Sequence, residues 1–312
     1  MGLYRQYMSN AAEIEPTRRP KLSGLPLIGI ALFLILVWGS AFTLVGVAVR
    51  TLSPEWLVAY RMILGAIMVL IYSYLKGQRL PHYRDSRWRW YTVIAVTGAS
   101  LPFVLVASGQ KTVDSGLTAI IVGTMPLITI VLAHFFTDEK LTSWKLIGFT
   151  MGFLGIIVLF LPKTLSLALV ADWRAQLLIL LASACYAATT VIASRTPETS
   201  SILGAAMMLL IGAILSTAWA AIASGPPPIP DMTAFLCALG LALGSTAIGT
   251  VLYLWVIDVS GPSVMARINY FIPVCSVALG VAFLKEVLDW RIFVSLFVIL
   301  LGVIVSRLGG AD

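Results

Sequence analysis

Charge is scarce in this chain of 312 residues: Asp, Glu, Lys and Arg together make up 11% of it, while hydrophobic residues make up 59%. A soluble domain carries roughly a quarter charged residues. A mean hydropathy of +0.97 leaves too little polar surface to cover a water-soluble core of this length. The composition excludes an ordinary soluble protein and predicts an integral membrane protein that lies almost entirely in lipid.

Cysteine and histidine are also rare. The cysteines Cys185, Cys237 and Cys275 fall in apolar stretches, with no CxxC pair and no His/Cys cluster. A disulfide framework or a metal site is therefore not expected. Two histidines and no acidic cluster offer no convergent titratable groups, so we expect neither an enzyme nor a cofactor. The expected partners are a small-molecule solute and membrane lipid, with no nucleic acid, and the chain is expected to function as a monomer.

Carboxylates are missing from the middle of every apolar segment. All 14 Asp and Glu residues lie in loops or at segment ends. Proton-driven pumps usually carry a buried carboxylate as the proton site. The absence of carboxylates from the middle of the segments favours a facilitator or an exchanger that is only weakly coupled to protons. The alternative is a proton site at the mouth of a cavity.

Long apolar segments are abundant, and a helix needs about 20 such residues to cross the hydrocarbon core. The fold class predicted is an all-α integral membrane protein with ten transmembrane helices. Lys and Arg outside these spans are concentrated on the side of the N-terminus, which predicts that both termini are cytoplasmic. The first run is too long for a cleavable signal peptide. The ten expected spans cover about 25–49, 56–75, 91–110, 116–136, 145–162, 175–194, 201–224, 233–257, 262–284 and 290–307.

The two halves of the chain resemble each other. A shift of 147 residues places Pro126 on Pro273 and Glu139 on Glu286. Each half holds five spans, and an odd number inverts the second half, as in the inverted repeats of many secondary transporters. The expected organisation is a polar cytoplasmic tail at 1–24, repeats at 25–162 and 175–307, a linker at 163–174 and a cytoplasmic C-terminus at 308–312.

Several short motifs carry a family resemblance. They are Trp38-Gly39-Ser40-Ala41-Phe42, Tyr60-Arg61, Pro126 with Asp138-Glu139-Lys140-Leu141, and Pro273 with Leu284-Lys285-Glu286-Val287-Leu288. With these motifs, residues 25–307 resemble the EamA family of the drug/metabolite transporter superfamily. Within it, the chain is most similar to the YddG-type exporters of aromatic amino acids and of the dication paraquat. The resemblance implies ten helices around a central cavity, alternating access between the repeats, and a bacterial inner membrane.

Prolines inside spans indicate where helices bend. Pro126 and Pro273 each remove one N–H and free a carbonyl four residues earlier, at Val122 and Asn269. Freed carbonyls at membrane depth are tolerated where they face protein or a wet cavity. We expect these helices to line a cavity; the alternative is that the prolines only shape packing. The expected helix-break and gating residues are Pro102, Pro126, Pro273, Glu139 and Glu286.

Aromatic and polar residues near the middle of spans indicate a binding site. Trp38 and Tyr186 lie too deep for interfacial anchors, and stacking or cation–π contact with a flat solute would explain them. Asn269 suits a ligand or an interhelical hydrogen bond, and core packing is the alternative for the aromatics. The candidate substrate-binding residues are Trp38, Ser40, Phe42, Phe103, Met125, Tyr186, Thr189, Tyr253, Asn269 and Tyr270.

The function that the resemblance implies, and with which these residues agree, is export of small solutes by alternating access. Aromatic or other amphipathic amino acids fit an aromatic, neutral pocket, as do apolar cations such as paraquat. The alternatives are a nucleotide sugar or phosphorylated solute, and proton-coupled drug efflux. An organophosphate would need several converging basic residues, and only Arg61 and Arg267 lie within spans. For these two, we expect a structural role, with the charged group reaching carbonyls or the membrane surface.

Overall fold

The computed structural model describes residues 24–136, 142–160, 169–193, 195–197, 199–260, 262–269, 271–286 and 290–308. Throughout these ranges the regular elements are helices. The first half contains α2 (Leu25–Ala48), α3 (Pro54–Leu75), α4 (Arg87–Ala95), η1 (Val96–Ser100), α5 (Leu101–Gly109), α6 (Ser115–Val122), α7 (Met125–Phe136) and α8 (Ser143–Phe160). The segments 1–23, 137–141 and 161–168 lie outside the described residues, so Glu139 does as well.

The second half follows the same order. It contains α9 (Leu169–Ala193), α10 (Ser201–Ser224), α11 (Met232–Gly240), η2 (Leu241–Ile248), α12 (Gly249–Ser260), α13 (Pro262–Asn269), α14 (Ile272–Leu279), η3 (Gly280–Leu284) and α15 (Trp290–Leu308). The η segments are π-helical turns, which are rare and often mark functional sites. Tyr270 lies outside the described residues.

Helix starts are fixed by local capping that recurs in both halves. The Ser53 hydroxyl accepts a hydrogen bond from the N–H of Trp56 at the start of α3, and 147 residues later the Ser200 hydroxyl does the same for Leu203 at the start of α10. Such a side-chain oxygen satisfies one of the N–H groups that the first helical turn leaves without a partner. The spacing of 147 residues found in the sequence therefore also separates these two helix starts.

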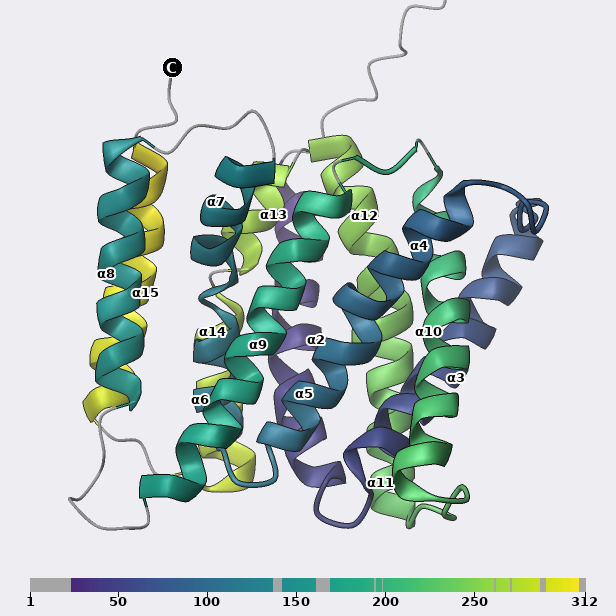
Figure 1. Ribbon diagram of the computed structural model, residues 1–312, viewed down its shortest axis with the longest axis horizontal. Helices are drawn as coiled ribbons and strands as arrows, with labels where there is room; N and C mark the ends of the chain where they lie inside the picture. Colours follow the sequence, from purple (N-terminus) through teal and green to yellow (C-terminus); the bar gives the residue numbers. More distant parts are fainter. Residues whose placement is uncertain are drawn as a thin grey trace, which may run out of the picture.

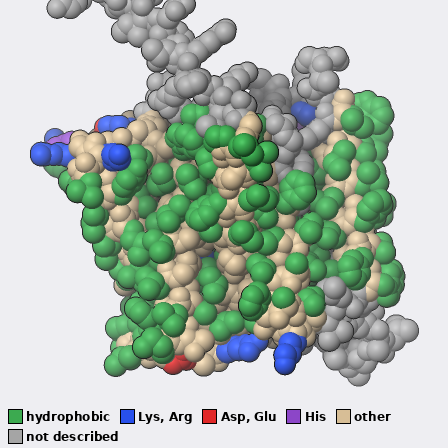
Figure 2. Space-filling model, turned by 180° about the vertical axis from the view of Figure 1, so that it is seen from behind, with side chains coloured by type: hydrophobic (Ala, Val, Ile, Leu, Met, Phe, Trp, Pro, Cys, Tyr) green, Lys and Arg blue, Asp and Glu red, His purple; other side chains and the backbone are tan. Residues whose placement is uncertain are grey.

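Seven helical segments in the described part of the chain are long and apolar enough to cross a membrane, and two shorter apolar helices, Ile272–Leu284 and Trp290–Ser306, accompany them. Helix also occupies each of the ten expected ranges, but the count of ten spans stays a prediction. The third helix begins at Arg87 instead of near 91, because the Asp85 carboxylate accepts the Arg87 N–H. Figure 2 shows a broad apolar surface with Lys and Arg gathered near its ends.

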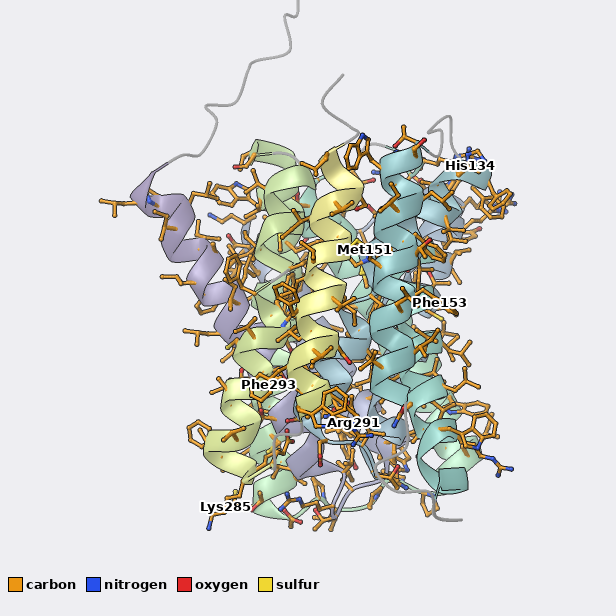
Figure 3. All side chains as sticks on the ribbon, turned by 90° about the vertical axis from the view of Figure 1, so that its left-hand side faces the viewer. His134, Met151, Phe153, Lys285, Arg291 and Phe293 are labelled. Carbon is orange, nitrogen blue, oxygen red and sulfur yellow. The ribbon has the colours of Figure 1, made fainter. Side chains whose placement is uncertain are left out.

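Two helices are broken at equivalent positions. The first break separates α6 from α7 and the second separates α13 from α14, and both ends of α13 and the start of α14 follow those of α6 and α7 by 147 residues. In Figure 1, α6 lies below α7 whereas α13 lies above α14, so the two broken helices run in opposite directions. Figure 3 agrees, since Lys285, after α14, and His134, in α7, lie near opposite ends of the molecule.

Helices of one half pack against helices of the other. α3 lies beside α10, and α8 lies beside α15, at opposite sides of the molecule in Figure 1. In Figure 3 the α8–α15 pair faces the viewer, and Phe153 and Phe293, which are 52% and 55% exposed, point outward. The largest core cluster is formed by buried residues of α3, α10 and α11 with the end of α2. The α3–α10 and α8–α15 pairs therefore join the two halves of the chain at opposite sides of the molecule.

Candidate functional site

A cavity of about 2250 Å³ lies between the helices and is lined by residues of both halves. Such a volume exceeds the few hundred to a thousand cubic ångströms of an ordinary small-molecule site. The lining includes Pro126 and Pro273 at the two helix breaks. Eight of the ten expected substrate-binding residues also line it: Trp38, Phe42, Phe103, Met125, Tyr186, Thr189, Tyr253 and Asn269.

The other expected site residues are not among the described residues that line the cavity. The Ser40 hydroxyl donates to the carbonyl oxygen of Val37 in its own helix, at 3.2 Å, and Ser40 is not among the residues that line the cavity. Pro102 is buried in the first turn of α5, directly after the π-helical turn η1. Tyr270 and Glu139 lie outside the described residues.

Aromatic rings from both halves meet in this cavity. Trp38 of α2 and Tyr253 of α12 make an edge-to-face contact, with ring centroids 5.8 Å apart. Phe103 of α5 and Tyr186 of α9 lie 6.4 Å apart in a tilted arrangement. The Trp38 Nε1–H donates to the carbonyl oxygen of Ser245 at 3.2 Å, which fixes the ring. The four rings provide flat apolar walls with which a ring-bearing solute can stack.

Arg61 is a cavity-lining residue that the sequence analysis expected to be structural. Its side chain is only 6% exposed, so it does not reach the membrane surface. Nε donates to the Thr246 hydroxyl at 3.0 Å and Nη2 donates to the Ser245 hydroxyl at 3.1 Å. The guanidinium lies over the Phe103 ring, 3.8 Å from its centroid. A cation is thus placed beside the aromatic walls.

The π-helical turn η2 contains both hydroxyl partners of Arg61. Ser245 and Thr246 are consecutive, so a regular α-helix would separate their side chains by about 100° around its axis. In η2 both hydroxyls accept from the same guanidinium. No short sequence motif predicts this arrangement, because the two hydroxyls lie 184 and 185 residues along the chain from Arg61.

The carbonyl that Pro126 frees has a protein partner. Val122 O accepts a hydrogen bond from the Ser183 hydroxyl of α9 at 3.2 Å, and the Thr124 hydroxyl lies 3.3 Å from the same Ser183 oxygen. The first helix break is therefore fastened to α9. At the second break, Asn269 lines the cavity, and its Oδ1 is buried without a hydrogen-bond partner among the described residues.

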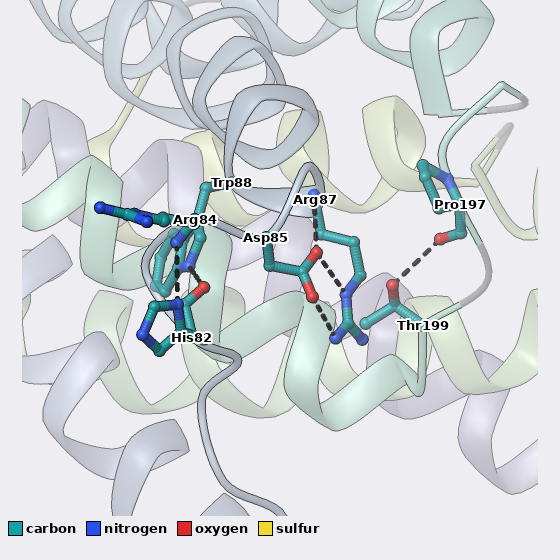
Figure 4. Close-up of polar contacts among 7 residues, drawn as sticks. All are labelled: His82, Arg84, Asp85, Arg87, Trp88, Pro197 and Thr199. Carbon is teal, nitrogen blue, oxygen red and sulfur yellow. Dashed lines mark hydrogen bonds and ion pairs between the residues drawn. The ribbon is translucent and has the colours of Figure 1, made fainter.

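The cavity extends to one end of the molecule. Its lining includes Lys76 and Gln78 after α3, Thr199 and Ser200 before α10 and Ser201 at the start of α10, and the Ser200 hydroxyl donates to Gln78 Oε1 at 2.6 Å. Beside this mouth, Arg87 binds Asp85 through two side-chain hydrogen bonds, drawn in Figure 4. These bonds from Arg87 hold the pKa of the partly exposed Asp85 carboxyl at about 2.

The opposite end is closed by polar contacts. Gln110 Nε2 donates to the carbonyl oxygen of Phe42 at 3.0 Å. The Glu286 carboxylate accepts from the backbone N–H groups of Ser115 and Gly116 at 2.7 and 3.1 Å, and from the Ser115 hydroxyl at 2.6 Å. Glu286 thereby caps the N-terminus of α6, where negative charge is favoured. Gln110, Ser115, Gly116 and Glu286 are not among the described residues that line the cavity.

Lys285 makes the Glu286 contact possible. It has φ of 56° and ψ of 36°, a left-handed conformation that turns the chain back after η3. The turn also requires Gly280, because a Cβ there would meet the Glu286 carboxylate and would lie 2.9 Å from the Ser115 hydroxyl. The partner of this carboxylate is the start of a helix in the other half of the chain.

Acidic groups are absent from the described cavity lining, whose charged members are Arg61 and Lys76. Within the described ranges, no group of three or more His, Cys, Asp or Glu side chains could hold a metal ion. The cavity presents aromatic rings, hydroxyls and an arginine at its middle. Such a lining can bind an amphipathic solute through stacking and hydrogen bonds.

Apolar helices, two oppositely running broken helices and a cavity open at one end define a multi-pass membrane protein of the transporter class. The model of the EamA-like transporter family matches residues 25–161 and again residues 173–308. The chain belongs to the EamA-like transporter family. It is a transporter and not an enzyme.

Three relatives illustrate the similarity. The uncharacterized inner membrane transporter YedA of Escherichia coli (strain K12) is 29% identical over 286 residues, which cover 91% of this chain and 92% of YedA. The uncharacterized transporter YoaV of Bacillus subtilis (strain 168) is 23% identical, over 87% of this chain and 93% of YoaV. A crystal structure that is 19% identical superposes with a TM-score of 0.65, over 93% of this chain and 100% of the other, and shows the fold. The match to YedA and the apolar helices support a multi-pass bacterial inner membrane protein.

Proposed function

We propose that this protein exports small amphipathic solutes, aromatic amino acids first among them, through ten membrane helices by alternating access between inverted repeats. The observation that carries the proposal is the cavity between two oppositely running broken helices, with aromatic walls drawn from both halves. Pro126 and Pro273 lie at those breaks, where a change of helix angle would open one end and close the other.

The proposed orientation places the cavity mouth in the cytoplasm. The loop beside the mouth and the first turn of α4 carry Lys76, Arg79, Arg84, Arg87 and Arg89, and short loops rich in Lys and Arg are typical of the cytoplasmic side. On this assignment the structure is an inward-open state, closed on the outside by Glu286 and Gln110. Solutes would enter from the cytoplasm, as export requires.

Phosphorylated solutes are the weaker candidate. Phosphate recognition calls for several basic groups on one site, whereas the described cavity lining offers Arg61 at its middle and Lys76 at its mouth. The lining also lacks a described carboxylate, the usual proton site of a proton-driven pump. An amino acid that equilibrates across the membrane fits this set of groups better.

Flux in proteoliposomes tests the proposal. We expect purified protein to equilibrate labelled phenylalanine or tryptophan, with little change when a pH gradient is imposed. Trp38→Ala should lower this flux by about 3- to 10-fold, because a stacking contact contributes about 0.5–1.5 kcal/mol. The measurement is the initial rate of uptake of labelled solute.

Trp219→Ala is the matched control, since Trp219 of α10 is 54% exposed on the outer surface and is not among the cavity-lining residues. Its flux should equal that of the unmodified protein. Absence of amino-acid flux from the unmodified protein would refute the substrate assignment. Accumulation driven by the pH gradient would instead establish proton coupling.

A further inference from the structure

Arg61 is a charged group built into the wall of the cavity. It is the eighth residue of α3, and it is only 6% exposed. It nevertheless borders the cavity, together with Phe103, Tyr186 and Ser245. A charged side chain inside a membrane protein is costly and usually faces a partner, a pathway or a ligand.

The partners of Arg61 within the protein are all neutral. Two donors are used on the hydroxyls of Ser245 and Thr246, and the guanidinium face rests on Phe103. Hydroxyl groups and a ring stabilise a cation but do not neutralise it. The described residues give Arg61 no ion pair with a carboxylate, and the described cavity lining contains none.

The same contacts orient the guanidinium toward the aromatic walls. Phe103, which lies under it, packs against Tyr186, and Ser245, which accepts from it, also anchors Trp38 through its backbone carbonyl. The Arg61 guanidinium and the rings of Phe103, Tyr186 and Trp38 are therefore connected through these contacts. Arginine presents a planar fork of donors that matches a carboxylate in two-point fashion.

We propose that Arg61 binds the carboxylate of the transported solute, so that the cavity takes anionic or zwitterionic aromatic solutes and rejects cations such as paraquat. The inference rests on the proposed function, and it narrows the substrate class stated there. The solute carboxylate supplies the counter-charge that the protein does not, while the solute ring lies against Phe103, Tyr186 and Trp38. A dication would bring like charge to a buried guanidinium and is excluded on electrostatic grounds.

Ligand binding to the purified protein tests this directly. The probes are phenylalanine, 3-phenylpropionate, which keeps the carboxylate, 2-phenylethylamine, which keeps only the ammonium, and paraquat. The affinity of each is measured from the ligand-dependent rise of the unfolding midpoint in detergent. We expect phenylalanine and 3-phenylpropionate to bind, and the two cations to bind at least about 10-fold more weakly, since an ionic hydrogen bond contributes about 1.5–3 kcal/mol.

Three variants assign the effect to Arg61. Arg61→Gln should lower the affinity for phenylalanine and for 3-phenylpropionate about 10- to 100-fold. It should also reduce the difference in affinity between these two carboxylates and the two cations. Arg61→Lys keeps the positive charge but loses the planar set of guanidinium donors. Its affinity for the carboxylates should therefore lie between those of the unmodified protein and of Arg61→Gln. Lys76→Gln is the matched control, because it removes the other described lysine or arginine of the lining, at the mouth over Tyr72, and it should change each affinity less than about 3-fold.

Two results would overturn the inference. One is unmodified protein that binds 2-phenylethylamine or paraquat as tightly as phenylalanine, or binds no carboxylate. The other is unchanged carboxylate affinity in folded Arg61→Gln, which would make Arg61 a tie between α3 and η2 only. Failure of the aromatic assignment gives a different pattern: leucine and 4-methylpentanoate would bind in an Arg61-dependent manner while the phenyl compounds do not.

Discussion

Glu286→Gln is expected to shift the closed end of the cavity toward an open form. The carboxylate of Glu286 accepts three hydrogen bonds from Ser115 and Gly116 at the N-terminus of α6. A glutamine has one acceptor oxygen, no charge to interact with the helix end, and an amide that would face N–H donors. Hydrogen bonds to a charged group contribute about 1.5–3 kcal/mol each, so a loss of about 2–4 kcal/mol would favour the open form by roughly 30- to 1000-fold.

Cysteine labelling measures that opening. Ala119 of α6 lies one turn behind the cap, lines the cavity and is 1% exposed. We expect Ala119→Cys, in protein lacking the three native cysteines, to react slowly with an impermeant maleimide applied from the Glu286 side. Adding Glu286→Gln should raise that rate by at least about 10-fold. Right-side-out and inside-out vesicles identify which side this is.

Glu55→Gln is the control for this experiment. Glu55, in the first turn of α3, accepts from the exposed Ser224 hydroxyl. Removing its charge should leave the labelling of Ala119→Cys unchanged. Equal labelling rates in the Glu286 and Glu55 variants would show that Glu286 caps α6 without holding the cavity closed.

The positions of the helix breaks could be predicted from single residues, whereas the contacts that hold the broken helices in place could not. A proline in an apolar run removes a hydrogen bond wherever it occurs, so Pro126 and Pro273 mark the breaks without reference to the rest of the chain. The Ser183 hydroxyl that holds Val122 O comes from another helix. Likewise, a helix-end carboxylate at Glu286 indicates that a partner exists, but only the tertiary arrangement identifies Ser115 and Gly116.

Arg61 shows the same limit for the candidate site. Its position near one end of a span favours reaching the membrane surface, because a long basic side chain extends toward water where it can. The π-helical turn η2 instead presents two hydroxyls, and Phe103 supplies a ring face. The aromatic residues of the cavity needed no such information, since a mid-span Trp or Tyr is unusual wherever it occurs.

Two glycine motifs of identical pattern have different surroundings. The sequence offers Gly148-x3-Gly152 and Gly240-x3-Gly244, both of which predict close helix packing. At Gly148 an added Cβ would meet the carbonyl oxygen of Gly302 and would lie 2.6 Å from the N of Ser306 in α15. At Gly240 it would meet only the Leu44 Cδ1, at 3.4 Å, which is an ordinary contact.

Gly148→Ala is therefore expected to destabilise the protein, whereas Gly240→Ala is not. Because backbone atoms block the added methyl group at Gly148, α8 and α15 must separate, and overpacking of this kind costs about 1–3 kcal/mol. At Gly240 the higher helix propensity of alanine, about 1 kcal/mol, is gained without a clash. The unfolding midpoint in detergent should fall by several degrees for Gly148→Ala, at about 2–4 °C per kcal/mol, and should hold or rise for Gly240→Ala. Equal midpoints for the two variants would contradict this prediction. They would mean that the α8–α15 contact adjusts to the methyl group, and that the GxxxG pattern has the same effect on stability at both positions.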